Sequence, residues 1–224
     1  MSSRAARPAT PARSSPRSAP AQGPHRVRII GGQWKRTPLP VLDAQGLRPT
    51  PDRVRESVFN WLTHLLDAGW ERVACLDAFA GTGALGFEAA SRGAGRVVMV
   101  ERFAPAVRQL EQTRAKLKAD AVQVQRGDAF ATMQSLAAQA TGPDGRFDLI
   151  FLDPPYHEDW LARMLPLCER LLAPGGLVYA EAEFALDGED VPAWMAPWEV
   201  VRSGRAGMVF YHLLQRKNLS EIEA

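Results

Sequence analysis

The chain of 224 residues is long enough for one domain with a buried core and short extensions. Hydrophobic residues make up 46% and charged residues 23%, which is ordinary for a soluble globular protein. No run approaches the roughly 20 apolar residues of a membrane helix, and the basic N-terminus lacks the apolar stretch of a secretory signal. We therefore expect a cytoplasmic protein with no membrane partner.

Cysteine and histidine usage argues against a metal site. The two cysteines, Cys75 and Cys168, lie in apolar segments and are expected to be buried thiols of a reducing compartment. Two thiols cannot form a four-thiolate zinc site or a thiolate-held iron–sulfur cluster. None of the four histidines has a metal-ligand spacing, and His157 is interpreted as a solvated residue at a helix start. We expect no metal.

Charge is distributed unevenly along the chain. Residues 1–42 contain seven arginines, one lysine and no acid, so they carry +8 and leave −6 for the rest of the formal +2. The basic end is either a solubilising tail or an electrostatic contact for phosphate. Residues 1–24 are rich in Ala, Pro, Ser and Arg and are predicted to be disordered, because they offer too little apolar surface to bury.

Residues 27–41 are predicted to form a β-hairpin, with Gly31-Gly32 at the turn and an extended second strand over 33–41. Arg28, Lys35 and Arg36 surround Trp34, a combination that suits single-stranded or loop RNA. The alternative is that Trp34 packs on the body while the charges are solvated, and this segment alone favours it.

A helix is predicted to follow Arg48-Pro49-Thr50-Pro51, with Thr50 as its cap and Pro51 in the first helical position. Its apolar stripe consists of Val54, Val58, Trp61, Leu62 and Leu65. Arg53, Arg55 and Glu56 lie off that stripe.

The remainder of the chain alternates between strands and helices. Strands are predicted at 73–77, 96–101, 121–125, 147–152 and 176–183, with helices at 84–92, 104–118, 129–139 and 157–172. Two final strands, 198–202 and 208–214, are joined by a loop over 203–207. Repeated βα units predict an α/β fold with a parallel sheet covered on both faces, and the short final loop makes the last pair antiparallel.

Four successive strands are followed by acids: Asp77, Glu101, Asp128 and Asp153. The carboxyl ends of parallel strands meet at one edge of the sheet, where ligands bind in such folds. Four acids at one edge therefore outline a site.

Gly81-Thr82-Gly83-Ala84-Leu85-Gly86 matches a glycine-rich turn between a strand and a helix. Such a turn lets a ligand approach the backbone closely. Glu101 lies 18 residues after Gly83, where a carboxylate can bind both ribose hydroxyls. A dinucleotide-dependent dehydrogenase would have the same motif, so it does not decide the cofactor by itself.

Asp153-Pro154-Pro155-Tyr156 favours a methyltransferase that acts on an exocyclic base amine. The lone pair of such an amine is delocalised into the ring, so two acceptors on its N–H bonds are needed to pull it toward tetrahedral geometry. The Asp153 carboxylate and the carbonyl of Pro154 supply them, and Tyr156 offers a face for an extruded base. Neither cysteine lies in a site loop, which disfavours methylation of a ring carbon.

With these motifs, the chain resembles the bacterial small-subunit ribosomal RNA guanine-N2 methyltransferases of the D type. The matching stretches are Arg28-Ile29-Ile30-Gly31-Gly32, residues 46–56 from Gly46 to Glu56, residues 76–86 from Leu76 to Gly86, and Asp153-Pro154-Pro155-Tyr156. The run Arg48-Pro49-Thr50-Pro51-Asp52-Arg53-Val54-Arg55-Glu56 is the most specific of them. The basic tail departs from the compact pattern of the family.

The resemblance implies a Rossmann-like class I fold with seven strands, the last of them antiparallel, and S-adenosyl-L-methionine as cofactor. It implies N2 methylation of one guanine in 16S rRNA, a guanine-966-type site, with the small ribosomal subunit or its assembly intermediate as partner. Catalysis is expected at residues 153–156. Cofactor contacts are expected at Asp77, Phe79, Ala80, Gly81, Thr82, Gly83, Glu101, Asp128 and Ala129. The residues expected to face RNA or shape the site are Arg28, Lys35, Arg36, Arg48, Arg53 and Arg55.

The expected organisation is a disordered tail (1–24), a hairpin and helix extension (25–66), the methyltransferase domain (67–218) and a short C-terminal tail (219–224). Three alternatives stay open. A DNA adenine-N6 methyltransferase would use the same Asp-Pro-Pro-Tyr step, but the chain is short for a separate base-reading domain. A protein glutamine methyltransferase usually has Asn in the position of Asp153. A non-enzymatic RNA-binding assembly protein would bind RNA without transferring methyl groups.

Overall fold

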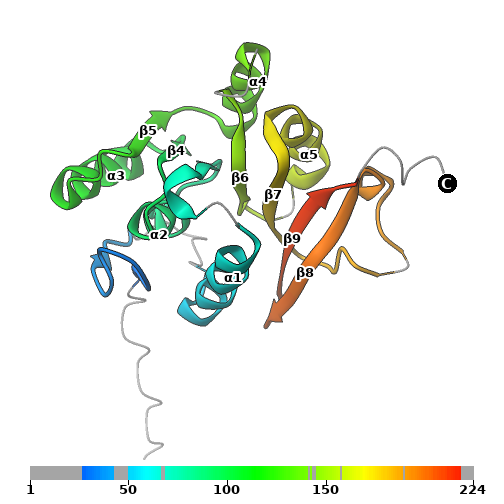
Figure 1. Ribbon diagram of the computed structural model, residues 1–224, viewed down its shortest axis with the longest axis horizontal. Helices are drawn as coiled ribbons and strands as arrows, with labels where there is room; N and C mark the ends of the chain where they lie inside the picture. Colours follow the sequence, from blue (N-terminus) through cyan, green and yellow to red (C-terminus); the bar gives the residue numbers. More distant parts are fainter. Residues whose placement is uncertain are drawn as a thin grey trace, which may run out of the picture.

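The computed structural model describes residues 27–42, 50–66, 69–140, 142, 145–156, 158–188 and 190–217. A seven-stranded sheet in the order β5-β4-β3-β6-β7-β9-β8 lies at its centre (Figure 1). The strands are β3 (Ala74–Asp77), β4 (Arg96–Glu101), β5 (Val122–Arg126), β6 (Phe147–Leu152), β7 (Leu172–Ala182), β8 (Trp198–Ala206) and β9 (Val209–Arg216). The strands from β5 to β7 pair in parallel, whereas β9 is antiparallel to both neighbours. The predicted fold class is confirmed.

Helices cover both faces of the sheet because successive strand residues point to opposite sides. On β3, Cys75 belongs to the core with α1 (Asp52–Leu65), α2 (Ala84–Ser91) and α3 (Ala104–Leu117). The next residue, Leu76, belongs to the core with α4 (Ala129–Gln139) and α5 (Trp160–Leu171). The described part of the chain also contains two short 3-10 helices, η1 (Trp70–Arg72) and η3 (Ala193–Met195).

The strand and helix boundaries agree with the sequence in some places and differ in others. The predicted bounds of β4 and β6 are those of the structure. The last two strands are longer than predicted, because β8 continues to Ala206 and the turn is reduced to Gly207 and Met208. Gly207 makes this tight turn with a φ of 65°. β7 starts earlier than predicted, at Leu172.

Helix α5 starts at Trp160 and contains Pro166 without being split. Its apolar face, which includes Met164, Leu165 and Cys168, is fully buried against the sheet, and this packing holds the helix together across the proline. Cys75 and Cys168 are both buried free thiols, as predicted. Within the described ranges, no helix has the length and apolar character to cross a membrane.

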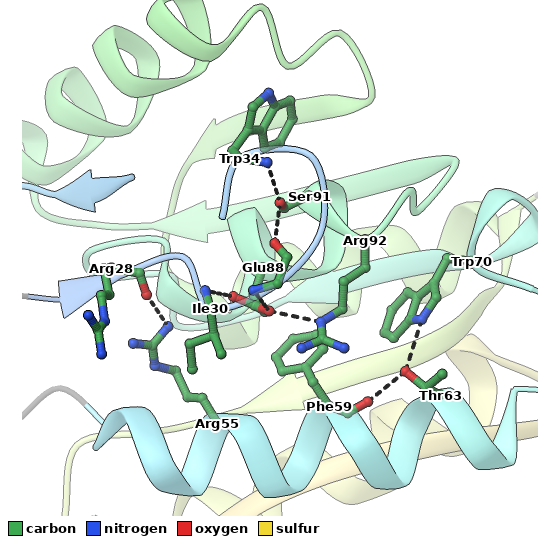
Figure 2. A network of polar contacts seen from close by, with 11 residues as sticks. Arg28, Ile30, Trp34, Arg55, Phe59, Thr63, Trp70, Glu88, Ser91 and Arg92 are labelled. Carbon is green, nitrogen blue, oxygen red and sulfur yellow. Dashed lines mark hydrogen bonds and ion pairs between the residues drawn. The ribbon is translucent and has the colours of Figure 1, made fainter. Parts of the chain in front are cut away.

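The N-terminal hairpin is present but shorter than predicted. β1 (Val27–Arg28) pairs antiparallel with β2 (Pro38–Leu39). The expectation of an extended strand over 33–41 is wrong, because residues 33–36 form a turn that binds helix α2 (Figure 2). The N–H of Gln33 donates to the Ser91 carbonyl at 2.7 Å, and the N–H of Trp34 donates to the Ser91 hydroxyl at 2.9 Å.

Glu88 attaches this hairpin to α2 through a buried carboxylate. It accepts the N–H of Ile30 at 2.6 Å and that of Gly31 at 2.9 Å, and it pairs with Arg92 at 2.8 Å (Figure 2). Gly32 passes so close to α2 that a Cβ atom there would lie 1.8 Å from the Ser91 carbonyl oxygen, and its φ is +71°. Glycine is required at this position, and the hairpin is held rigidly against the helix.

Candidate active site

A cavity of about 370 Å³ opens at the carboxyl edge of β3, β4 and β6. It is lined by all but one of the residues predicted to bind cofactor or to act in catalysis. The exception is Gly83, which lies between the lining residues Thr82 and Ala84 and makes the turn into α2. The lining residues among the predictions are Asp77, Phe79, Ala80, Gly81, Thr82, Glu101, Asp128, Ala129, Asp153, Pro154, Pro155 and Tyr156.

The glycine loop forms one wall of this cavity and leads into α2. Gly83 has a φ of +77°, and a Cβ atom there would lie 2.5 Å from the ring of Phe87. The N–H of Gly81 donates to the Glu101 carboxylate at 2.9 Å. The loop is thus held close to β4 by its own backbone, and its small residues leave space for a ligand.

Asp77 is buried beneath the glycine loop. Its carboxylate accepts the N–H of Gly86, in the first turn of α2, at 3.0 Å. Burial raises the pKa of Asp77 to about 7, although the hydrogen bond from Gly86 acts in the opposite direction. A cation bound in this cavity would favour the charged carboxylate and lower its pKa. The affinity for such a ligand should therefore depend on pH.

Glu101 and Asp128 complete the edge that the sequence outlined. Glu101 accepts a second backbone N–H, that of Phe103, at 2.7 Å. Since a carboxylate has about four lone-pair sites, these two bonds orient Glu101 and leave it able to accept hydroxyl donors. Asp128 caps α4 by accepting the N–H of Ala131 at 3.0 Å.

The Asp153 carboxyl group belongs to a cluster that the sequence did not reveal. The hydroxyl of Thr50 lies 3.3 Å from Oδ2 of Asp153 and donates to Oε1 of Glu181 at 2.6 Å. Tyr179 donates to the same Glu181 oxygen at 2.7 Å. The prediction that Thr50 caps α1 is wrong: Pro51 occupies the cap position, and the Thr50 side chain is engaged by the acids.

Glu181 lies near the end of β7, the fifth predicted strand. An acid at the carboxyl end of a strand was the signal that identified Asp77, Glu101, Asp128 and Asp153, and Glu181 has the same signal. Burial and the charge of Glu181 raise the pKa of Asp153 well above its usual range. Burial also raises the pKa of Glu181, while the hydroxyls of Thr50 and Tyr179 favour its charged form. The two carboxyls therefore titrate as a coupled pair, and N–H donors from a ligand would favour their charged forms.

A second cavity of about 190 Å³ adjoins the first. The two share the walls formed by Pro154, Pro155, Tyr156 and Trp160. Asp153 lines the first cavity, whereas Glu181 lines the second. The pair of acids thus lies where the two cavities meet.

The basic residues predicted to face RNA or shape the site are not equivalent. Arg28, Lys35, Arg36 and Arg53 are exposed, and Arg48 lies outside the described residues. Arg55 is fully buried, although it lies off the apolar stripe predicted for α1. It cannot reach RNA, and only a role in shaping the site remains for it.

Arg55 is buried because α1 is covered on a second side by the hairpin (Figure 2). Its guanidinium donates to the carbonyl of Arg28 at 2.9 Å and the carbonyl of Thr50 at 3.3 Å, and it pairs with Asp52 at 2.6 Å. Arg55 thereby fixes the segment that carries Thr50. Trp34 packs partly buried against the core, as the favoured interpretation expected.

Among the residues that the structure describes, no cluster of three or more His, Cys, Asp or Glu side chains could hold a metal ion.

Comparison with known proteins identifies the family. The family model described as Conserved hypothetical protein 95 matches residues 27–215. The ribosomal RNA small subunit methyltransferase D of Escherichia coli strain K12 is 40% identical over 205 residues, which cover 90% of this chain and 96% of that protein. The chain belongs to this methyltransferase family.

Solved structures agree with the fold. A putative methyltransferase, yhhF, from Escherichia coli has a TM-score of 0.69 and 36% identity, covering 86% of this chain and 99% of that one. An RNA methyltransferase from Salinibacter ruber in complex with S-adenosyl-L-homocysteine has a TM-score of 0.52 at 20% identity, covering 74% of this chain and 92% of that one, which supports the fold alone. As a member of the family the chain is a methyltransferase, and S-adenosyl-L-methionine is its cofactor.

Proposed function

We propose that this protein transfers a methyl group to the exocyclic N2 of one guanine in 16S rRNA, within the small ribosomal subunit or its assembly intermediate. Membership of the family supports the coarser part, an S-adenosylmethionine-dependent rRNA methyltransferase. The observation that carries the finer part is the position of Asp153, at the junction of a cofactor-sized cavity and a second cavity.

The residues of the first cavity fit the cofactor. The small glycine loop leaves room for its methionine part, Glu101 keeps acceptor capacity for ribose hydroxyls, and Asp77 offers a carboxyl group to a cation. When bound, S-adenosylmethionine supplies an electrophilic methyl group on a sulfonium. The protein's task is to hold the acceptor nitrogen in line with that methyl group.

Asp153 and Pro154 act on the acceptor amine. The Asp153 carboxylate accepts one N–H and the carbonyl of Pro154 accepts the other, which draws the nitrogen lone pair out of conjugation. The N–H donors also favour the charged form of Asp153, which is disfavoured before the substrate binds. The proton that the amine loses passes to the carboxyl pair and then to water, while Tyr156, which is partly exposed, gives the base a stacking face.

The basic hairpin is proposed to hold the RNA. Arg28, Lys35 and Arg36 are exposed on a segment that Glu88 fixes to α2, the helix that follows the glycine loop. Arg53 is exposed at the start of α1 on the adjoining segment. A rigid basic surface on the N-terminal extension, which also carries Thr50 of the site, would position a phosphate backbone relative to the cofactor.

The deciding experiment is methylation of small ribosomal subunits from a strain that lacks the enzyme. The subunits are incubated with the protein and isotope-labelled S-adenosylmethionine, and the rRNA is digested for nucleoside mass spectrometry. We expect one N2-methylguanosine per subunit, mapped to one nucleotide by fragment analysis. Label in N6-methyladenosine, or in ribosomal protein glutamine, would replace the proposal with an alternative substrate. Binding without transfer would indicate an assembly protein.

A further inference from the structure

Glu181 is a buried carboxyl group for which the proposed transfer gives no role beyond proton sharing. It is 3% exposed, and the hydroxyls of Thr50 and Tyr179 both donate to its Oε1. Among the ion pairs between described residues, none involves Glu181 or Asp153. Burial of a carboxylate without a cation is costly, and such groups concentrate at functional sites.

The surroundings of Glu181 suit a flat molecule with N–H donors. Glu181 lines the second cavity, whose walls include four aromatic residues. These are Tyr156, Trp160, Phe184 and Trp194. Aromatic faces stack on bases, and a carboxylate in the wall of such a cavity can accept hydrogen bonds from the edge of the base.

When both are charged, as N–H donors from a bound base would favour, the two neighbouring acids match guanine and no other common purine. Guanine carries a ring N1–H beside its N2 amino group, so two donors lie next to each other on one edge. Adenine carries a bare N1 lone pair beside its amine, and a carboxylate would repel that lone pair. We infer that Glu181 accepts the ring N1–H of the target guanine while Asp153 accepts an N2–H, so that Glu181 selects the base. The inference rests on the proposed guanine specificity.

The hydrogen bonds to Glu181 support this role because they fix the group without saturating it. Both hydroxyls meet Oε1, at 2.6 Å from Thr50 and 2.7 Å from Tyr179. The Asp153 carboxyl also forms a hydrogen bond with Glu181, and since a carboxylate has about four lone-pair sites, acceptor capacity remains for a base. Since Thr50 touches both acids, the two acceptors are held at a fixed separation, as selection between base edges requires.

Glu181→Gln tests the inference through a change of preference. Glutamine keeps the size of the side chain but presents one acceptor and one N–H donor. That pattern matches 2-aminopurine, which keeps the 2-amino group but has a lone pair at N1. Subunits are reconstituted with guanine or 2-aminopurine at the mapped nucleotide, and kcat/KM is measured for both. We expect the wild type to prefer guanine by about 100-fold or more, and Glu181→Gln to narrow that ratio at least about tenfold.

The control and the contrary outcomes are defined by the same measurement. Glu199→Gln, an exposed change on β8, should leave both rates and their ratio unaltered. Tyr179→Phe keeps the carboxylate and should lower the rates without changing the ratio. Equal losses on both bases in Glu181→Gln, no change, or a folded cofactor-binding variant that methylates neither base would overturn the inference.

A second variant covers the possibility that Glu181→Gln fails to fold. Glu181→Asp remains a double acceptor, so the preference for guanine must persist at a lower rate, and its loss would also overturn the inference. Failure of the proposed function is distinguishable, because the wild type would then produce no N2-methylguanosine in the mapping experiment.

Discussion

The hydroxyl of Thr50 donates to the carboxylate of Glu181 at 2.6 Å, although 131 positions separate the two residues in the sequence. Thr50 is itself held through its carbonyl by the buried guanidinium of Arg55. The N-terminal extension therefore reaches the carboxyl pair directly. It forms part of the candidate active site as well as the surface proposed to bind RNA.

Thr50→Val should lower turnover while leaving cofactor affinity intact. Valine has the shape of threonine but leaves the buried Glu181 without one of its donors, a loss of about 1–3 kcal/mol. If the whole of this loss raises the free energy of the transition state, kcat falls by about 5- to 150-fold. Thr50→Ser retains the hydroxyl and is the matched control. Single-turnover methylation with saturating cofactor measures the effect. An unchanged rate in Thr50→Val would show that the Thr50 hydroxyl has no part in catalysis.

Cofactor affinity should depend on pH through Asp77. Burial raises the pKa of Asp77 to about 7 in the free protein, and a bound cation favours the charged form. Binding therefore lowers this pKa and releases a proton below about pH 7, so affinity rises with pH and levels off above it. The limiting slope is about tenfold per pH unit.

Calorimetric titration with S-adenosylmethionine between about pH 6 and about pH 8 checks this, and Asp77→Asn should flatten the profile. The same shift acts on folding. Between the ordinary pKa of 3.8 and about pH 7, Asp77 keeps its proton in the native state but has lost it in the unfolded chain. The contribution of Asp77 to the free energy of unfolding therefore falls as pH rises from 3.8 to about 7. A wild-type affinity that does not vary with pH would indicate that no cation binds beside Asp77.

Gly32→Ala should detach the hairpin from α2. The added Cβ atom would meet the Ser91 carbonyl oxygen at 1.8 Å, and the φ of +71° alone costs about 1–2 kcal/mol in alanine. We expect a lower melting temperature and weaker binding to small subunits, with cofactor affinity within about twofold. Gly188→Ala is the control, since a Cβ there has no atom within 4 Å. If the Gly32→Ala protein is destabilised but binds small subunits as well as the wild type does, the hairpin is not part of the RNA-binding surface.

Lys35→Ala and Arg36→Ala should each reduce the salt dependence of subunit binding. Each phosphate contact contributes about one unit to the slope of log affinity against log salt concentration. Both side chains are exposed on the turn that α2 holds, so removing one should not unfold the protein. Lys116→Ala, exposed at the end of α3, should leave the slope unchanged. Equal slopes in all three variants would place the RNA contacts elsewhere.

The sequence allows the sheet and the cofactor edge to be predicted because both depend on local signals. Apolar runs such as 147–152 identify strands, and an acid after each strand marks the common edge. The position of Thr50 could not be predicted in this way, because its partner lies across the fold. The burial of Arg55 could not be predicted from one apolar stripe, because α1 is packed on two sides, and the second depends on where the hairpin docks.

Asp153→Ala and Glu101→Ala should have opposite kinetic signatures. Asp153 is proposed to hold the reacting amine, a contact whose value increases as the nitrogen changes shape in the transition state, so its loss lowers kcat more than binding. Glu101 orients the glycine loop through Gly81 and lines the cofactor cavity, so its loss should weaken cofactor affinity first. Saturating cofactor should then restore much of the Glu101→Ala rate but none of the Asp153→Ala rate.

Asp153→Asn refines this comparison because it keeps one acceptor oxygen but cannot take up the proton that the amine loses. We expect a rate between those of the wild type and Asp153→Ala, with less dependence on pH than the wild type, since the proton-sharing pair with Glu181 is gone. Single-turnover kinetics at saturating cofactor across about pH 6–9, with calorimetry for cofactor affinity, provide both readouts. Full activity in Asp153→Ala would remove the Asp-Pro-Pro-Tyr step from the mechanism, and parallel losses of affinity in both variants would mean that the two acids serve the cofactor together.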